Sequence, residues 1–210
     1  MLKDEEKERV KKEFEGLTGK VKLIVFTQEI ECEYCEENRK LSEEVVSLSE
    51  KLTLEVCNFQ LDKEKVAKYK VDKVPAIVVE GAKDYGIKFY GIVSGFEFSS
   101  LLEAIKMVSN GESGLSKTTK DKLRGLNEPV HIQVFVTPSC PYCTATVIMA
   151  HKLAVENGLI TADMVETTEF LDLAQKYNVF SVPKVIINET IQFDSALPET
   201  KFVEKVLKAG

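Results

Sequence analysis

Two pairs of cysteines, each with two residues between them, are the groups in this chain best suited to chemistry. The first pair is Cys32-Glu33-Tyr34-Cys35 and the second is Cys140-Pro141-Tyr142-Cys143. The thiolate of such a CxxC pair can attack the disulfide of another molecule, and the second thiol can then displace the mixed disulfide. The pattern therefore predicts thiol–disulfide exchange at two places in the chain.

Two other uses of four cysteines are less compatible with this spacing. A structural zinc ion needs four thiolates in one tetrahedron, commonly from pairs ~15–20 residues apart. Here residues 36–139 separate the pairs. A permanent disulfide that closes so short a loop adds little stability. A zinc-stabilised scaffold stays as the alternative from another functional class, and no metal-ligating residue is assigned.

The cysteine pairs belong to an internal repeat. The displacement from position 32 to position 140 also aligns the segment 69–79 with the segment 177–187, in which a tyrosine, two valines and a proline coincide. Each half therefore has a proline, Pro75 or Pro183, at the same distance after its second cysteine. The Gly- and Ser-rich segment 110–116 has the composition of a linker. We therefore expect two domains, at residues 1–112 and 113–210.

Hydrophobic periodicity predicts the same order of elements in both halves, β-α-β-α-β-β-α. The first apolar run of each half leads directly into a cysteine pair, and apolar residues at helical spacing follow it. The predicted strands are 21–27, 52–60, 76–80 and 86–90 in the first half, and 130–137, 160–166, 184–187 and 190–193 in the second. Besides the helix after each CxxC, the predicted helices are 4–15, 63–69, 97–108, about 117–126, 169–177 and 199–208.

A strand that leads into CxxC at the start of a helix, followed by Val-Pro before a β-hairpin, resembles the thioredoxin fold. Two such units in tandem resemble the protein disulfide oxidoreductases of thermophilic archaea and bacteria, also called glutaredoxin-like proteins. Cys-Pro-Tyr-Cys is in addition the motif of glutaredoxins. The resemblance implies an α/β protein of two tandem thioredoxin-like domains, each with a mixed central sheet flanked by helices.

The resemblance also implies an activity. The expected protein is a cytoplasmic oxidoreductase that reduces, forms or isomerises protein disulfides, as a protein disulfide isomerase does, through redox-active disulfides and without another cofactor. Its implied partners are protein thiols and disulfides, and a flavoenzyme similar to thioredoxin reductase. The alternative is an electron-relay module, because the N-terminal region of the alkyl hydroperoxide reductase flavoprotein also has two thioredoxin-like units. In that region only one unit usually keeps a CxxC, so two intact motifs favour the first hypothesis.

The cysteines have different expected roles. A thiol at a helix N-terminus faces unpaired N–H groups and the positive end of the helix dipole, which lower its pKa. We therefore expect Cys32 and Cys140 to be the nucleophiles, and Cys35 and Cys143 to be the resolving thiols.

The resemblance assigns a role to the Val-Pro pairs as well. It implies that Pro75 and Pro183 follow cis peptide bonds beside the cysteines. The backbone groups of the preceding residues, Val74 and Val182, would then be free to bind an extended substrate by strand addition. The tyrosines inside the motifs, Tyr34 and Tyr142, are expected to shape the intervening dipeptide and to touch substrate.

Two features differ from a standard thioredoxin. The buried Asp that precedes the thioredoxin motif is replaced by Phe26 in the first half and by Val134 in the second. The proton acceptor for the resolving cysteines is therefore not identified by the resemblance. The Trp before the motif is replaced by Glu31 and Ser139.

The remaining candidate side chains are expected to be structural. Cys57 lies in a predicted strand, and free cysteines are among the most buried residues, so we expect it to be inert. His131 and His151 have no ligand partner at a useful spacing, and we expect them to be structural or exposed.

Charge distinguishes the two motifs. Five glutamates surround the first one, whereas segment 137–146 has no charged residue; the five are Glu29, Glu31, Glu33, Glu36 and Glu37. Negative charge near a sulfur disfavours the thiolate, although Arg39 and Lys40 compensate in part. We therefore expect Cys140 to be the more acidic and more reactive thiol.

Composition excludes several classes of protein. The net charge of −6 and the lack of a long basic run argue against nucleic acid as the partner. No run approaches the ~18 apolar residues of a membrane span, and residues 1–9 have no apolar segment typical of a signal peptide. A surface dominated by Lys and Glu, without Trp, resembles that of thermophile proteins.

Overall fold

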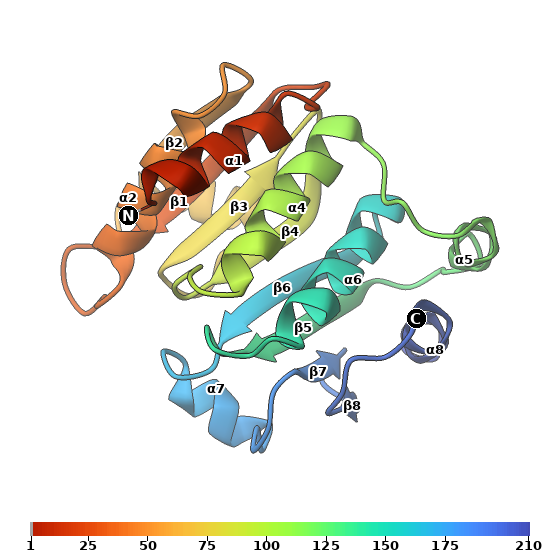
Figure 1. The fold of residues 1–210 in the computed structure, drawn as a ribbon. Coiled ribbons are helices and arrows are strands. Elements are labelled where there is room, and N and C mark those ends of the chain that lie inside the picture. The colour runs from red at the N-terminus through yellow and green to blue at the C-terminus, as the bar shows by residue number, and fades with distance from the viewer. Residues whose placement is uncertain (1) are drawn as a thin grey trace.

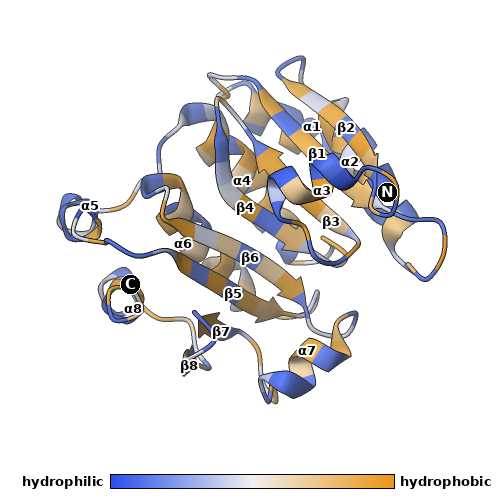
Figure 2. Ribbon diagram, turned by 180° about the vertical axis from the view of Figure 1, so that it is seen from behind, coloured by the Kyte–Doolittle hydropathy of each residue, from blue (hydrophilic) through white to orange (hydrophobic). Residues whose placement is uncertain are grey.

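The computed structural model describes residues 2–210, which form a mixed sheet covered by helices on both faces (Figures 1 and 2). The strands of the first half are β1 (Val21–Thr27), β2 (Leu52–Asn58), β3 (Ala76–Glu80) and β4 (Asp84–Tyr90). Those of the second half are β5 (Val130–Val136), β6 (Ile160–Glu166), β7 (Lys184–Ile187) and β8 (Ile191–Phe193). The helices are α1 (Asp4–Phe14), α2 (Cys35–Val46), α3 (Lys63–Tyr69), α4 (Glu97–Asn110), α5 (Lys117–Leu123), α6 (Cys143–Glu156), α7 (Leu171–Lys176) and α8 (Glu199–Val206).

The two repeats share one eight-stranded sheet, in the order β2-β1-β3-β4-β6-β5-β7-β8. Within each half one strand pair is parallel and two are antiparallel, which is the expected mixed sheet. The halves join where β4 pairs with β6 in parallel, from Ile87 opposite Ala162 to Tyr90 opposite Val165. Helices α4 and α6 lie side by side across this junction (Figure 1). The prediction of two thioredoxin-like units is confirmed, and the structure adds their continuous sheet.

Side chains of each central strand alternate between two cores. In β1, Leu23 and Val25 point into the larger core beneath α1, α2 and α4, whereas Ile24 and Phe26 point into the core on the opposite face. That second core also holds Tyr69 of α3. Because both faces of the strand are covered, it reads as a continuous apolar run in the sequence.

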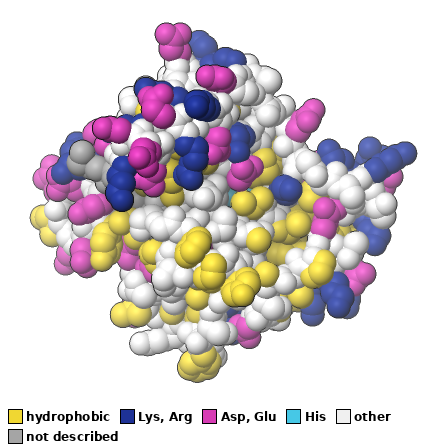
Figure 3. All heavy atoms as spheres, viewed as in Figure 1, with side chains coloured by type: hydrophobic (Ala, Val, Ile, Leu, Met, Phe, Trp, Pro, Cys, Tyr) yellow, Lys and Arg dark blue, Asp and Glu magenta, His cyan; other side chains and the backbone are white. Residues whose placement is uncertain are grey.

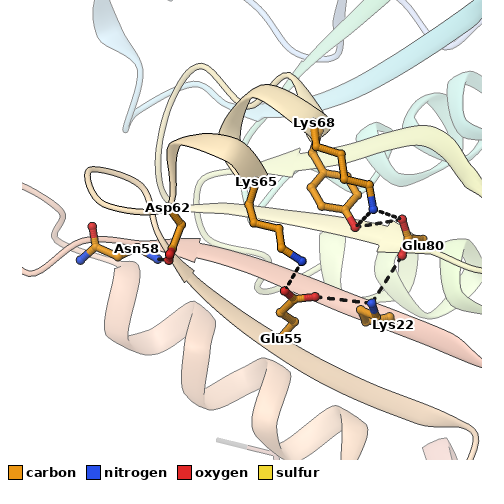
Figure 4. A network of polar contacts seen from close by, with 8 residues as sticks. Lys22, Glu55, Asn58, Asp62, Lys65, Lys68 and Glu80 are labelled. Atoms are coloured by element: carbon orange, nitrogen blue, oxygen red, sulfur yellow. Dashed lines mark hydrogen bonds and ion pairs between the residues drawn. The ribbon is translucent and has the colours of Figure 1, made fainter.

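Ion pairs attach α3 to the outer strands of the first half (Figure 4). Lys65 of α3 pairs with Glu55 of β2 at 2.5 Å, and Lys68 pairs with Glu80 of β3 at 3.3 Å. Lys22 of β1 lies between these carboxylates, 3.4 Å from Glu55 and 3.6 Å from Glu80. The network therefore spans three strands on the face that α3 covers. Over the other face, acidic and basic side chains are interspersed around α1 (Figure 3).

The predicted elements are all present, with small differences at their ends. Strand β2 stops at Asn58 rather than residue 60, because Asn58 N–H donates to Asp62 and the chain turns there. Helix α7 begins at Leu171 rather than residue 169, because Glu169 N–H donates to Glu166 in a preceding turn. Within residues 2–210, no helix is both long and apolar enough to span a membrane.

Candidate active site

Both cysteine pairs follow the end of a strand and end at the first residue of a helix. Cys32 and Cys35 form a disulfide between β1 and α2, and Cys140 and Cys143 form one between β5 and α6. Strand pairing makes β1 and β5 run in the same direction through β3, β4 and β6. The two disulfides therefore lie at the same end of the continuous sheet.

The first disulfide opens into a pocket that contains most of the residues predicted for this site. Cys32, Tyr34, Val74 and Pro75 line this pocket, which has a volume of about 410 Å³. The Val74–Pro75 peptide bond is cis. The fold therefore brings the cysteine motif and the Val-Pro pair together, although they are far apart in the sequence, as the thioredoxin resemblance implies.

The second disulfide lies beside the equivalent Val-Pro pair of the second half. The sulfur of Cys140 lies 3.7 Å from the carbonyl oxygen of Val182, and the Val182–Pro183 bond is cis. Tyr142 is 71% exposed beside the disulfide. Main-chain groups of Val182 are therefore within reach of a segment that approaches the Cys140 sulfur.

The two cysteines of each pair differ in exposure. Cys35 and Cys143 are buried, and the Cys35 sulfur accepts a hydrogen bond from Gln28 N–H at 3.4 Å. Cys32 is half-buried, and Cys140 is 7% exposed. The first cysteine of each pair is thus the more exposed residue, clearly at Cys32 and by a small margin at Cys140.

The residues six positions before the motifs provide no proton acceptor. Phe26 and Val134 are both fully buried among apolar side chains. Near the second disulfide the structure instead has Glu97 at the start of α4, which is 1% exposed. Its carboxylate accepts hydrogen bonds from Ser100 and, at 3.4 Å, from Thr144, the residue directly after Cys143. Burial raises the pKa of Glu97 to about 7, despite these two hydroxyl donors.

A carboxylate of the second half lies at the first disulfide. Glu169, in the turn after β6, lines the pocket that contains Cys32 and accepts a hydrogen bond from Ile92 N–H at 2.5 Å. Burial raises the pKa of Glu169 to about 7, and the neighbouring carboxylates of Glu166 and Glu33 act in the same direction. Each cysteine motif therefore has a carboxyl group of raised pKa near it, contributed by the other half of the molecule.

Sequence reasoning missed Glu97 and Glu169. The repeat is a poor guide here: position 169 corresponds to Leu61, and α8 also begins at a glutamate, Glu199, but that residue accepts a hydrogen bond from Ser116 N–H. The available signal at Glu97 was an acidic residue within the apolar face of a helix. Only the packing of α4 on α6 brings Glu97 near Cys143, and the sequence does not show which helices pack together.

The remaining candidates have the expected structural roles. Cys57 is buried, and burial raises the pKa of its thiol, which makes it a poor nucleophile. His151 is fully buried against the Phe89 ring, 4.8 Å between ring centroids, and burial lowers its pKa to about 3. His131 lies 2.6 Å from Asp163. In residues 2–210, no three His, Cys, Asp or Glu side chains are grouped to hold a metal ion.

Comparison with known proteins agrees with this geometry. A sequence model of the family described as "Thioredoxin domain" matches residues 20–102 and 130–208. The chain therefore belongs to the thioredoxin-domain family and contains two such domains in tandem. Its two CxxC pairs have the chemistry that dithiol–disulfide exchange needs.

Two solved structures match nearly the entire chain. A protein disulfide oxidoreductase from Aeropyrum pernix matches with a TM-score of 0.94 and 32% identity, covering 100% of this chain and 94% of that one. The NTD_N/C domain of the alkyl hydroperoxide reductase AhpF from Enterococcus faecalis matches with a TM-score of 0.91 and 27% identity, covering 98% and 100%. The chain is thus a homologue of a protein disulfide oxidoreductase and is similar to an AhpF N-terminal domain.

Curated relatives are longer proteins. The F component of alkyl hydroperoxide reductase from Staphylococcus epidermidis is 32% identical over 106 residues, which are 50% of this chain and 20% of that protein. An NADH dehydrogenase from Ferdinandcohnia aciditolerans is 26% identical over 152 residues, 72% of this chain and 28% of that protein. The chain spans less than a third of the length of these two relatives.

Proposed function

We propose that this protein exchanges thiols and disulfides with other proteins, and that each CxxC pair is a complete redox centre. One observation carries this proposal most directly: both disulfides lie beside a cis Val-Pro pair, in a chain similar over its whole length to a protein disulfide oxidoreductase. A cytoplasmic location stays a prediction from the sequence.

The proposed reaction is an exchange of two electrons. In the reduced protein, the thiolate of Cys32 or Cys140 attacks one sulfur of a substrate disulfide, forms a mixed disulfide and releases the other substrate sulfur as a thiolate. The thiolate of Cys35 or Cys143 then attacks the first cysteine. The second substrate sulfur leaves as a thiolate, and the two substrate thiolates take up protons. The substrate is reduced, the CxxC is oxidised, and a dithiol donor must reduce it again.

The Val-Pro pairs and the tyrosines are proposed to hold the substrate. Backbone groups of Val74 and Val182 would pair with an extended segment around the substrate disulfide, with Pro75 and Pro183 fixing their orientation. Exposure of Tyr142 and the place of Tyr34 in the first pocket support contact with that segment. Main-chain pairing of this kind accepts many sequences, which suits a protein with varied substrates.

Glu97 is proposed as the proton acceptor for the resolving thiol of the second site. Support comes from its burial, its contact with Thr144 next to Cys143, and a raised pKa of about 7. A carboxyl group with a pKa near the working pH can both accept and return a proton. It would take the role of the buried Asp that this chain lacks.

A second candidate function is electron transfer to one dedicated partner. The likeness to the AhpF N-terminal domain and to a curated alkyl hydroperoxide reductase favours it. In either case we propose that a flavoenzyme similar to thioredoxin reductase supplies the electrons. Activity on several unrelated protein disulfides would support the first function, and activity on one protein alone would support the second.

The proposed domain division is 1–112 and 113–210. Helix α4 ends at Asn110, the following Gly111 has a φ of +66° that stops the helix, and the Ser116 hydroxyl caps the start of α5. Both segments matched by the thioredoxin family lie within these limits.

Cysteine substitutions test the proposed function. Combining Cys32→Ser with Cys140→Ser should abolish reduction of insulin disulfides with dithiothreitol as the electron donor, because no other activated thiol would be left. The control, Cys57→Ser, should leave the rate unchanged. Retention of most activity by the double variant, or its loss in the control, would refute the assignment. One zinc ion bound per chain in the reduced protein would favour the scaffold alternative.

A further inference from the structure

The groove at the first disulfide is built from both halves of the molecule. Its first-half wall contains Cys32, Glu33 and the Val74–Pro75 pair, and its second-half wall contains Thr168 and Glu169. The hydrogen bond from Ile92 N–H to Glu169 holds this carboxylate at the junction of the halves. Glu169 also lines a neighbouring pocket that contains Asp72 and Asp172, so the groove continues onto the second half.

This groove carries an excess of negative charge. Glu31, Glu33 and Glu169 line the pocket around Cys32, and no basic residue does. Two adjoining pockets each contain one basic residue, Arg39 in a pocket that Cys32 and Glu33 also line, and Lys73 in the pocket of Asp72 and Asp172, and each basic residue has an acidic partner. Arg39 lies 3.9 Å from Glu43, and Lys73 lies 2.5 Å from Asp72 and 3.8 Å from the centre of the Tyr90 ring. The pocket around Cys32 therefore has three carboxylates and no basic side chain in its wall, and Arg39 and Lys73 in adjoining pockets offset this charge only in part.

The second site has neutral residues at the corresponding positions. The repeat places Ser139, Pro141 and Phe180 where the first half has Glu31, Glu33 and Asp72. Phe180 is 93% exposed and Tyr142 is 71% exposed. Both sites therefore have a CxxC disulfide beside a cis Val-Pro bond, but the surface around the first is acidic and that around the second is neutral and apolar.

We propose that the two sites divide their substrates by charge: the first site prefers disulfides within extended segments rich in Lys and Arg, with Glu169 of the second half as a specificity-determining residue. The second site prefers neutral and apolar segments. This inference rests on the proposed function and names a substrate class for each of its two centres.

The physical basis is attraction at the groove wall. A segment that pairs with the backbone at Val74 places its side chains along the groove, where a lysine can approach Glu33 or Glu169. Such complementarity acts on association and on the choice of partner, and salt screens it. A nearby cation would also stabilise the ionised form of Glu169, whose burial otherwise raises its pKa to about 7. The carboxylate is therefore best tested at pH 8, where it is ionised.

The test uses full-length variants that keep one site each. Cys140→Ser with Cys143→Ser leaves the first site, and Cys32→Ser with Cys35→Ser leaves the second. Both reduce two disulfide-bonded peptides of one length, flanked by lysines or by glutamates, with dithiothreitol as the reductant. We expect the first-site protein to prefer the lysine peptide ~10-fold at low ionic strength and only ~2-fold at ~0.5 M salt. The second-site protein should show less than ~2-fold preference.

Two single substitutions in the first-site protein locate the effect. Glu169→Gln should reduce the preference for the lysine peptide by ~3-fold. Glu128→Gln removes the same charge at an exposed position before β5, at the opposite end of the sheet from both disulfides, and should leave the preference unchanged. If Glu169→Gln fails to fold, Glu33→Gln on the exposed wall of the groove replaces it.

The outcomes separate the inference from the proposed function. Equal rates with both peptides in the first-site protein, or equal effects of Glu169→Gln and Glu128→Gln, would overturn the division by charge and leave the redox function intact. Failure of both one-site proteins to reduce either peptide would contradict the proposed function itself.

Discussion

Single residues around the two disulfides set different electrostatic conditions for the same chemistry. Glu33 lies inside the first motif, whereas Pro141 occupies its place in the second. The carboxylate of Glu33 also raises the pKa of the adjacent Tyr34. Because a negative neighbour disfavours a thiolate, the first site has the less favourable surroundings for an ionised nucleophile.

We therefore expect Cys140 to have a lower thiol pKa than Cys32, and its disulfide to be the more oxidising, since a stabilised thiolate favours the reduced form. One unit of difference in pKa corresponds to about 1.4 kcal/mol. Rates of iodoacetamide alkylation against pH, measured on the two one-site proteins, give both values. A lower pKa at Cys32 would show that local hydrogen bonds outweigh the glutamates.

Glu97 links function to stability at the second site. Its pKa is raised from 4.5 to about 7 in the folded protein, so its contribution to stability is fully present below pH 4.5 and is lost as the pH rises through 7. Glu97→Gln should therefore gain on the order of 2 kcal/mol relative to the natural protein between pH 5 and pH 8.

Urea denaturation at the two pH values measures this gain, and a difference that does not change with pH would contradict the buried carboxyl group. The same variant should reduce turnover at the second site without affecting the first, because it cannot accept the proton of Cys143. The Cys140→Ser, Cys143→Ser background is the matched control, since only the first site operates there.

At the scale of elements, the segment between β4 and α4 connects the helices of both active sites. Asn38 of α2 is fully buried, and its side chain donates to Gly91 O at 2.7 Å and accepts from Val93 N–H at 3.1 Å. A few residues later, Phe96 N–H donates to Pro138 O, just before the second motif. Gly95 has a φ of +60°, and a Cβ added there would lie 2.3 Å from Pro138 O. The backbone at position 95 can therefore come this close to Pro138 only with glycine.

Asn38→Ala should destabilise the protein by about 2–4 kcal/mol, because it creates a cavity and leaves two buried backbone groups without partners. The control is Thr146→Val at the corresponding position of α6. Thr146 donates to Tyr142 O, at the residue just before its own helix and not in another element, so we expect a loss of about 1 kcal/mol or less. Equal losses in the two variants, measured by thermal or urea denaturation, would argue against a special role of the Asn38 contacts.

At the scale of the whole molecule, a buried ion pair fixes the register between the halves. Lys88 of β4 pairs with Asp163 of β6 at 3.0 Å, and both are almost fully buried. Burial alone would raise the pKa of Asp163, but Lys88 and His131 together lower it to about 2. The contribution of Asp163 to stability is therefore present above its unfolded pKa of about 4 and is lost as the pH falls through 2.

Asp163→Asn should destabilise the protein by about 3–5 kcal/mol at pH 7, because it leaves the Lys88 ammonium buried without its partner. The double variant Lys88→Met, Asp163→Leu should recover most of this loss, since no uncompensated charge is left. Urea denaturation of the three proteins measures both effects. A double variant as unstable as Asp163→Asn would show that packing, rather than charge, is decisive here.

The separated halves should be much less stable than the complete chain. Cutting between 112 and 113 exposes the β4 and β6 edges, together with Phe89 and His151, which pack between the halves. Exposed strand edges of this kind favour aggregation. We expect the isolated segments 1–112 and 113–210 to precipitate or to associate when mixed, as size-exclusion chromatography can detect. Two soluble monomers that do not associate would contradict this.

The sequence by itself determined the chemistry and the local structure. Both CxxC motifs, the repeat, the Val-Pro pairs and nearly all the strands and helices are local patterns, and local hydrophobic periodicity is enough to locate them. Such patterns also predict that Cys57 and Phe26 are buried, as they are in the structure.

The tertiary structure decided how the two repeats complete each other. The pairing of β4 with β6 joins two sheets that the sequence predicts only separately. Glu169 reaches the pocket at Cys32, and Glu97 reaches Thr144 beside Cys143, through contacts between residues far apart along the chain. Periodicity reports which face of an element is buried but not which distant element covers it, so the carboxyl groups at both sites emerged only from the packed molecule.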